Sequence, residues 1–203
     1  MDNLLQWSRS RLNRIYPKKG EHALRDLVAD TAHMYLTILH YKEIEFTNDI
    51  PQESTVYADA DLLSCVIRNL ISNAIKYTPP GGRIHIEQLA AKDVITVIVT
   101  DSGPGIPEPQ INGIFSDTLV SATGLMQEKG SGIGLKLCRE FVELNGGTIR
   151  AHSIPGTCTQ FIFTIPAARQ PIPAAPATRS LHSKTILPWP KYPPPQQAAN
   201  PGA

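Results

Sequence analysis

The chain contains 203 residues, of which 41% are hydrophobic and 18% are charged, and its formal net charge is +1. This length suits one globular domain with additional segments, and the near-neutral charge argues against a nucleic acid partner. The apolar run from Val94 to Val99 is too short to cross a bilayer, and the polar residues after Met1 do not form a secretory leader. We therefore expect a cytoplasmic protein without direct membrane contact, whose three cysteines are reduced core thiols rather than metal ligands.

The two ends of the chain differ in composition from the part between them. The segment MDNLLQWSRSRLNRI spaces its leucines as an amphipathic helix does, and Pro17 ends that helix. Residues 167–203 hold nine of the chain's 18 prolines, which predicts a disordered or polyproline II tail; a docking peptide for a proline-reading domain stays open as the alternative. We expect a helical stub over 1–20, a folded domain over 21–166 and a tail over 167–203.

Between these ends, hydrophobic periodicity predicts interleaved helices and strands. The predicted elements are, in order, a helix (22–43), a strand (44–50), a helix capped by Asp59 (59–78), two strands (83–89 and 94–100), a helix (133–144) and two closing strands (147–153 and 159–166). The strands come in adjacent pairs joined by short turns, which favours helices on one face of a mixed sheet. We expect an α+β fold, namely a two-layer α/β sandwich in which about three helices cover a mixed sheet.

The predicted helix over 59–78 carries polar residues at the margin of its apolar stripe. Asn69 and Asn73 are four residues apart and share a face, Lys76 lies on the same face, and Tyr77 lies at its edge. Asparagine is a poor helix former because its side chain competes for backbone hydrogen bonds, so two on one face indicate a use. Two solvent-facing or locally bonded amides are the alternative, and a bare pair of this kind favours it.

The strand that follows ends in the segment VTDSGPGIP. Asp101 stands at the strand end, with Gly103 and Gly105 directly after it. A carboxylate there can accept a hydrogen bond from a ligand amine, while glycine lets the backbone pass close to that ligand. An ordinary Asp-Ser-Gly turn is the alternative for this segment taken alone.

A third segment, KGSGIGLKLC, places Gly130, Gly132 and Gly134 at the start of an amphipathic helix. The amides at a helix start and the helix dipole favour phosphate, and Lys129 adds a positive charge nearby. No GK[ST] follows, so the segment is not a P-loop, and it does not match the dinucleotide fingerprint. Alone, this glycine run is weak evidence.

In order and spacing, the three segments together resemble the ATP-binding domain of sensor histidine kinases, within the wider group that includes gyrase. The segments NLISNAIKYT, DSGPGIP and GSGIGLKLCREFVELNGGTI resemble its N, G1 and G2 boxes. The resemblance covers residues 21–166 and implies a Bergerat-type fold. Residues 3–12 resemble the end of the second helix of the kinase dimerisation domain.

The resemblance implies a role for each polar residue of the first two segments. Asn73 would hold Mg²⁺ bridging the ATP phosphates, and Asn69 would support the metal and the phosphates. Lys76 would reach the phosphates, and Tyr77 would lie against the nucleotide. These three residues, Asn69, Asn73 and Lys76, would form the catalytic set. Asp101 would accept a hydrogen bond from the adenine amino group, which selects adenine because guanine offers a carbonyl there.

The glycines and the helix start would handle the phosphates and the lid. Gly103 and Gly105 would let the end of the strand hinge, and a mobile lid would run from about 106 to 129. Amides of the third segment would bind the β- and γ-phosphates. The other predicted nucleotide-binding residues are Ile106, Lys129, Gly130, Ser131, Gly132, Ile133, Gly134 and Leu135.

The resemblance implies transfer of the ATP γ-phosphoryl group to a histidine, as in a two-component phosphorelay. None of the six histidines has the family's setting, a histidine followed by an acidic residue, so the acceptor would belong to a dimerisation domain outside this chain. The intact kinase would be a homodimer, and an N-terminal part outside this chain could anchor it to a membrane. A response-regulator aspartate would receive the group next.

Three alternatives remain from the sequence. The lid keeps Phe115 but lacks the family's second phenylalanine and arginine, which leaves open a non-catalytic, anti-sigma-type nucleotide-binding module. An ATPase of the gyrase kind is disfavoured, because Asn69 stands where those enzymes carry a glutamate that activates water. An inactive relic of a kinase is the third.

Overall fold

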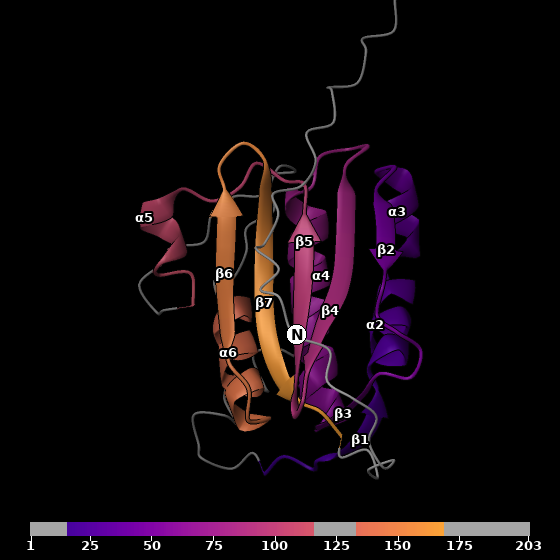
Figure 1. The fold of residues 1–203 in the computed structure, drawn as a ribbon. Coiled ribbons are helices and arrows are strands. Elements are labelled where there is room, and N and C mark those ends of the chain that lie inside the picture. The colour runs from indigo at the N-terminus through magenta and orange to yellow at the C-terminus, as the bar shows by residue number, and fades with distance from the viewer. Residues whose placement is uncertain (1–15, 116–132, 169–203) are drawn as a thin grey trace, which may run out of the picture. The chain divides into compact units, whose positions relative to one another are not determined.

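The computed structural model describes residues 16–115 and 133–168 (Figure 1). The predicted N-terminal helix, residues 116–132 of the predicted lid and nearly all of the proline-rich tail lie outside the described residues. The proposed boundaries at 20 and 166 therefore stay predictions, and the description below concerns the folded domain only.

A five-stranded mixed sheet forms one layer of the domain (Figure 1). Its strands, in spatial order, are β2 (Glu45–Asn48), β4 (Arg83–Ala91), β5 (Val94–Asp101), β7 (Cys158–Pro166) and β6 (Ile149–Ile154). β2 pairs in parallel with β4, and the other neighbours pair antiparallel. The register places Asp101, the last residue of β5, opposite Ile84 and Thr159.

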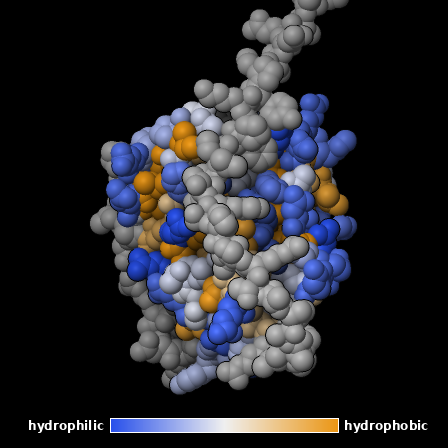
Figure 2. All heavy atoms as spheres, in the orientation of Figure 1, coloured by the Kyte–Doolittle hydropathy of each residue, from blue (hydrophilic) through white to orange (hydrophobic). Residues whose placement is uncertain are grey.

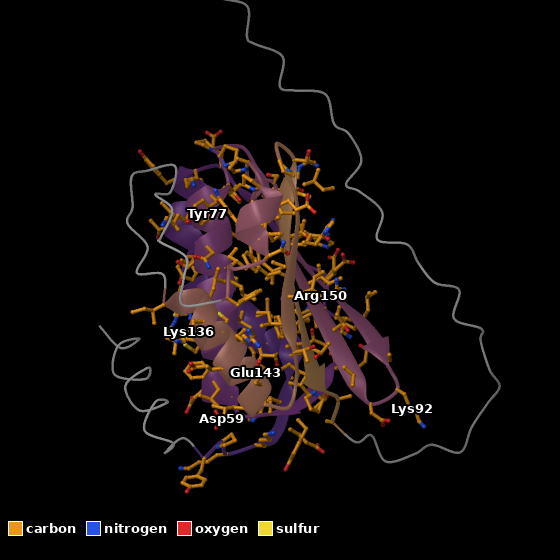
Figure 3. The ribbon with its side chains drawn as sticks, turned by 90° about the vertical axis from the view of Figure 1, so that its left-hand side faces the viewer. Asp59, Tyr77, Lys92, Lys136, Glu143 and Arg150 are labelled. Carbon is orange, nitrogen blue, oxygen red and sulfur yellow. The ribbon has the colours of Figure 1, made fainter. Side chains whose placement is uncertain are left out.

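Helices form the second layer and cover one face of the sheet (Figures 1 and 3). The helices of the described residues are α2 (Leu24–His33), α3 (Leu36–Tyr41), α4 (Ala60–Tyr77), α5 (Glu108–Ile111) and α6 (Gly134–Leu144). On the other face of the sheet, hydrophilic and hydrophobic side chains are mixed (Figure 2). The predicted α+β class, a helix layer on a mixed sheet, is confirmed.

The apolar stripe of α4 fills the centre of the core. The residues of this stripe are at most 1% exposed: Leu63, Val66, Ile67, Leu70, Ile71 and Ala74. The predicted cap is also present, since the Asp59 carboxylate accepts a hydrogen bond from the Leu62 amide at 3.0 Å. Its other oxygen accepts one from the Lys18 amide at 2.6 Å. The sequence pattern thus defines both the buried face and the start of α4.

A buried amide connects the start of α4 to the end of α6. The Asn145 side chain is fully buried, accepts a hydrogen bond from the Asp59 amide at 2.7 Å and donates one to the Phe141 carbonyl at 3.0 Å. Since unsatisfied buried amides are costly, these bonds fix the two helices relative to one another.

The prediction of a single helix over 22–43 is wrong, because α2 ends at His33 and a separate helix, α3, begins at Leu36. The Met34 amide donates to the Thr31 carbonyl, which tightens the last turn of α2. In α3, Leu39 is buried, whereas Leu36 is 53% exposed. The periodicity continued across the break, and this made the two helices look like one.

Three short elements were not predicted. β1 (Gly20–Ala23) and β3 (Thr55–Ala58) form a separate two-stranded antiparallel sheet, and α5 spans four residues. Unlike β2, which lies within the predicted alternating segment 44–50, these elements are not part of a longer periodic run, and tertiary contacts define them. Ala167 joins this small sheet through an antiparallel bridge to Val56.

Candidate nucleotide-binding site

The polar residues of α4 lie at the margin of its buried face, as predicted. Asn69, Asn73, Lys76 and Tyr77 are all partly buried. The Asn69 amide nitrogen donates to the Cys65 carbonyl one turn earlier, at 2.9 Å. This bond fixes the Asn69 side chain and leaves its oxygen directed toward the start of α6.

The start of α6 lies directly against that oxygen. A Cβ placed on Gly134 would lie 3.0 Å from Asn69 Oδ1, which is tighter than nearly all ordinary contacts. Glycine at this position therefore lets the first turn of α6 approach the amide on α4. The first and third predicted segments thus meet in the structure, at Asn69 and Gly134, which are 65 residues apart in the sequence.

The first turn of α6 has the chemistry of an anion site. Amides of a first helical turn have no acceptor within the helix, and the dipole adds partial positive charge. Ile133, the N-cap residue, has an apolar side chain that cannot accept from those amides, and no acidic residue stands in the turn. Such a helix start suits a ligand phosphate, whose oxygens accept hydrogen bonds from backbone amides.

Asp101 is buried at the end of β5, with 3% of its surface exposed. The Gly103 amide donates to its Oδ1 at 2.9 Å. Burial desolvates the carboxylate and raises its pKa to about 7, while the Gly103 hydrogen bond opposes that shift. A buried carboxylate with such a raised pKa is a good candidate for binding a polar ligand group.

The segment after Asp101 packs directly on the end of α4. A Cβ on Gly103 would lie 2.9 Å from the Tyr77 carbonyl oxygen and 2.6 Å from Asp101 Oδ1. No side chain fits there without moving backbone. The second predicted segment therefore joins the first at Tyr77, as the first joins the third at Gly134.

The start of the predicted lid is held to the turn between β6 and β7. Gly105 adopts a positive φ of 72°, and a Cβ there would lie 2.5 Å from the Ile154 carbonyl oxygen. The Ile106 amide donates to Ser153 Oγ at 2.8 Å. Phe115 makes an edge contact with Phe161, with ring centroids 6.3 Å apart. Any lid movement that includes residues 106–115 would have to break these contacts.

Several predicted residues lie outside the described part of the chain. These are Lys129, Gly130, Ser131 and Gly132. Of those that are described, Lys76 places its Nζ 5.1 Å from the centre of the Tyr77 ring, so the two side chains lie together. Ser153 and Asn145, which position parts of the site, were missed because nothing in their local sequence shows partners that lie far along the chain.

Comparison with known proteins gives the family. Residues 58–169 match the family described as histidine kinase-, DNA gyrase B- and HSP90-like ATPase, and the chain belongs to it. Within that family, the described domain is the ATP-binding catalytic domain of a two-component sensor histidine kinase. The chain is similar to the adaptive-response sensory kinase SasA of Synechococcus sp. (strain JA-3-3Ab), with 38% identity over 169 residues. That alignment covers 82% of the chain but 45% of the relative, so the chain spans less than half the length of this relative.

Solved structures agree with this assignment. The nucleotide-free catalytic domain of the histidine kinase ThkA shares 29% identity and a TM-score of 0.65, over 73% of this chain and 95% of that one. Full-length ShkA in complex with AMPPNP has a TM-score of 0.71 over 83% of this chain and 35% of that one; at 23% identity it supports the fold. Among the residues that the structure describes, no helix has the length and apolar character needed to cross a membrane.

Proposed function

We propose that the chain binds Mg-ATP where α4, the end of β5 and the start of α6 meet, and transfers the γ-phosphoryl group to a histidine on another domain. The main support is that α4 contacts both of the other segments: Asn69 meets the start of α6 at Gly134, and Tyr77 meets the segment after β5 at Gly103. A buried carboxylate and a helix start then stand at two ends of one surface of α4. An adenine nucleotide has an amine at one end, which would match the carboxylate, and phosphates at the other, which would match the helix start.

The residues present fit this ligand. The Asp101 carboxylate would accept a hydrogen bond from the adenine amine, and the first turn of α6 would donate to the phosphates. Within the described ranges, no cluster of three His, Cys, Asp or Glu side chains could hold a metal by itself. Asn69 and Asn73 would instead offer amide oxygens to a Mg²⁺ that arrives with the phosphates, as magnesium sites at phosphates often do. Bound magnesium would neutralise charge developing on the transferring group.

Phosphoryl transfer fits these residues better than hydrolysis. An asparagine amide cannot take a proton from water, and the Asn69 nitrogen already donates to the Cys65 carbonyl. A neutral imidazole needs little activation as a nucleophile, so the chain's residues would mainly hold ATP in position and stabilise charge.

The acceptor is proposed to come from a dimerisation domain of the intact homodimeric kinase. His33 and His40 are exposed on α2 and α3, and His85 lies 2.9 Å from Asp49 on the sheet. None of these has the setting expected of the acceptor, so the chain alone should not phosphorylate itself. We further propose that residues 1–20 end the dimerisation helix, that a response-regulator receiver domain accepts the group next, and that these steps occur in the cytoplasm.

The test combines the chain with labelled ATP, Mg²⁺ and a separate histidine-bearing dimerisation domain. Acid-labile label on that domain supports the kinase; binding without transfer indicates a non-catalytic module, and steady phosphate release indicates an ATPase. Asn73→Asp is expected to lower transfer by roughly a hundredfold or more, because it adds negative charge beside the phosphates. Asn200→Asp in the tail makes the same chemical change and should leave transfer as it was. Equal transfer by both variants would remove Asn73 from the site.

A further inference from the structure

A buried lysine stands at the end of α4. Lys42 follows α3 and is 3% exposed. Its Nζ donates to the Ile75 carbonyl at 2.5 Å and to the Thr78 carbonyl at 2.6 Å. Both acceptors belong to the last turn of α4 and its C-cap, 33 and 36 residues further along the chain.

The physical chemistry of a helix end explains why an ammonium group is placed there. The last carbonyls of a helix have no partner within the helix, and the dipole makes that end partly negative. A buried cation is tolerated when such acceptors surround it. Lys76 and Tyr77, two of the proposed nucleotide contacts, lie between the two carbonyls that Lys42 binds.

The backbone of Lys42 holds the turn that follows α4. Its carbonyl accepts from the Gly81 amide at 2.9 Å, and the Glu45 amide donates to the Gly82 carbonyl at 2.9 Å. A Cβ on Gly82 would lie 2.8 Å from Ser102 Oγ, so this turn packs tightly on the segment after Asp101. One residue therefore contacts the end of α4 through its side chain and the following turn through its backbone.

We propose that Lys42 is a positioning residue for the nucleotide site, an inference that rests on the proposed function above. It acts through α4: the ammonium holds the last turn, which sets the place of Lys76 and Tyr77. The Tyr77 carbonyl in turn is the surface against which Gly103 packs beside Asp101. Loss of the ammonium would let the last turn fray and would misplace the adenine and phosphate contacts together. Small displacements of positioning groups cost large factors in binding and rate.

The test compares Lys42→Met with Lys42→Arg and with Lys92→Met in the full chain. Lys92 is exposed on the turn between β4 and β5 and lies far from Tyr77 (Figure 3). Methionine keeps the apolar part of the lysine side chain but removes its hydrogen-bond donors. At a temperature where the variant is still folded, its affinity for ATP should therefore be lower by a factor of about ten or more. Arginine retains charge and donors and should recover most of that loss. Lys92→Met should bind as the parent does.

ATP affinity compared with melting temperature separates positioning from a purely structural role, because a purely structural role lowers the melting temperature alone. The backbone amide NMR signal of Gly103, which meets α4 at the Tyr77 carbonyl, reports whether the displacement reaches the adenine contact. In the ligand-free chain, Lys42→Met should shift this signal, whereas Lys92→Met should not. Should Lys42→Met fold too poorly, Lys42→Gln is expected to change binding in the same direction. A lower melting temperature with unchanged ATP affinity and an unchanged Gly103 signal would overturn the positioning role alone. Failure of the parent chain to bind ATP would overturn the proposed function, and this inference with it.

Discussion

Replacing Asp101 by asparagine is expected to weaken ATP binding by about a hundredfold and to remove the preference for ATP over GTP. A site built to hydrogen-bond one substrate group strongly rejects an analogue that lacks it. The asparagine can keep its oxygen on the Gly103 amide, as Oδ1 of Asp101 does at 2.9 Å. Its nitrogen then faces the ligand, where it suits the guanine carbonyl and not the adenine amine. Calorimetric titration with both nucleotides measures the ratio.

The same carboxylate makes ATP binding depend on pH. Because burial raises the pKa of Asp101 to about 7, much of the carboxyl is protonated just below neutrality. The ionised form accepts from the adenine amine, so ATP should bind roughly tenfold more tightly at about pH 8 than at about pH 6. ATP itself titrates in this range, and the Asp101→Asn variant, measured with the same solutions, supplies that background. An equal pH slope in parent and variant would contradict the assignment of Asp101 to the adenine amine.

The raised pKa also predicts the pH dependence of stability. The folded chain binds the Asp101 proton more tightly than the unfolded chain, whose carboxyl titrates near 3.8. The contribution of Asp101 to the free energy of unfolding should therefore fall as pH rises from about 4 to about 7, and should level off above that. Asp101→Asn should remove this part of the slope in urea titrations. A slope that stays unchanged would mean that the buried carboxyl does not titrate as stated.

Gly147→Ala is expected to lower the free energy of unfolding by about 3 kcal/mol or more. A Cβ at this position would lie 1.7 Å from the Thr164 carbonyl oxygen and 2.7 Å from its carbonyl carbon. The Gly147 amide also donates to the Val142 carbonyl at 2.9 Å, so the turn cannot move away without breaking the end of α6. The added methyl group must push β7 and α6 apart. Urea denaturation followed by circular dichroism measures the change.

Gly20→Ala is the matched control for this substitution. The nearest atom to a Cβ on Gly20 is Nε2 of His22, at 3.3 Å, and it belongs to a side chain that can turn away. The expected change is within about 0.5 kcal/mol. Equal stability of Gly147→Ala and Gly20→Ala would show that the turn after α6 is more adaptable than its contacts indicate.

The sequence predicted those parts of the fold whose patterns are local and long. The apolar stripe and the Asp59 cap defined α4, and alternation defined β4, β5 and β7. The break after His33 was missed because hydrophobic residues continue through it. β2 is as short as β1 and β3 but was predicted within the alternating segment 44–50, whereas β1 and β3 do not lie in an alternating run of that length.

For the site, glycine spacing and polar residues at helix and strand ends predicted which segments would meet. The groups that hold those segments in place could not be predicted in the same way. Lys42 is an ordinary lysine in the sequence, and its acceptors are backbone carbonyls, which carry no sequence signal. Asn145 directly follows α6, and its partner, the Asp59 amide, lies 86 residues away in the sequence.

The contact between Gly134 and Asn69 also limits how this chain can drift during evolution. Because a Cβ on Gly134 would lie 3.0 Å from Asn69 Oδ1, we expect exchanges at these two positions to depend on one another. A larger residue at position 134 would require the Asn69 side chain to shift by a few tenths of an ångström or to be replaced by a shorter one. Lineages that have abandoned phosphoryl transfer should therefore show paired exchanges at these two sites, whereas active lineages should show neither.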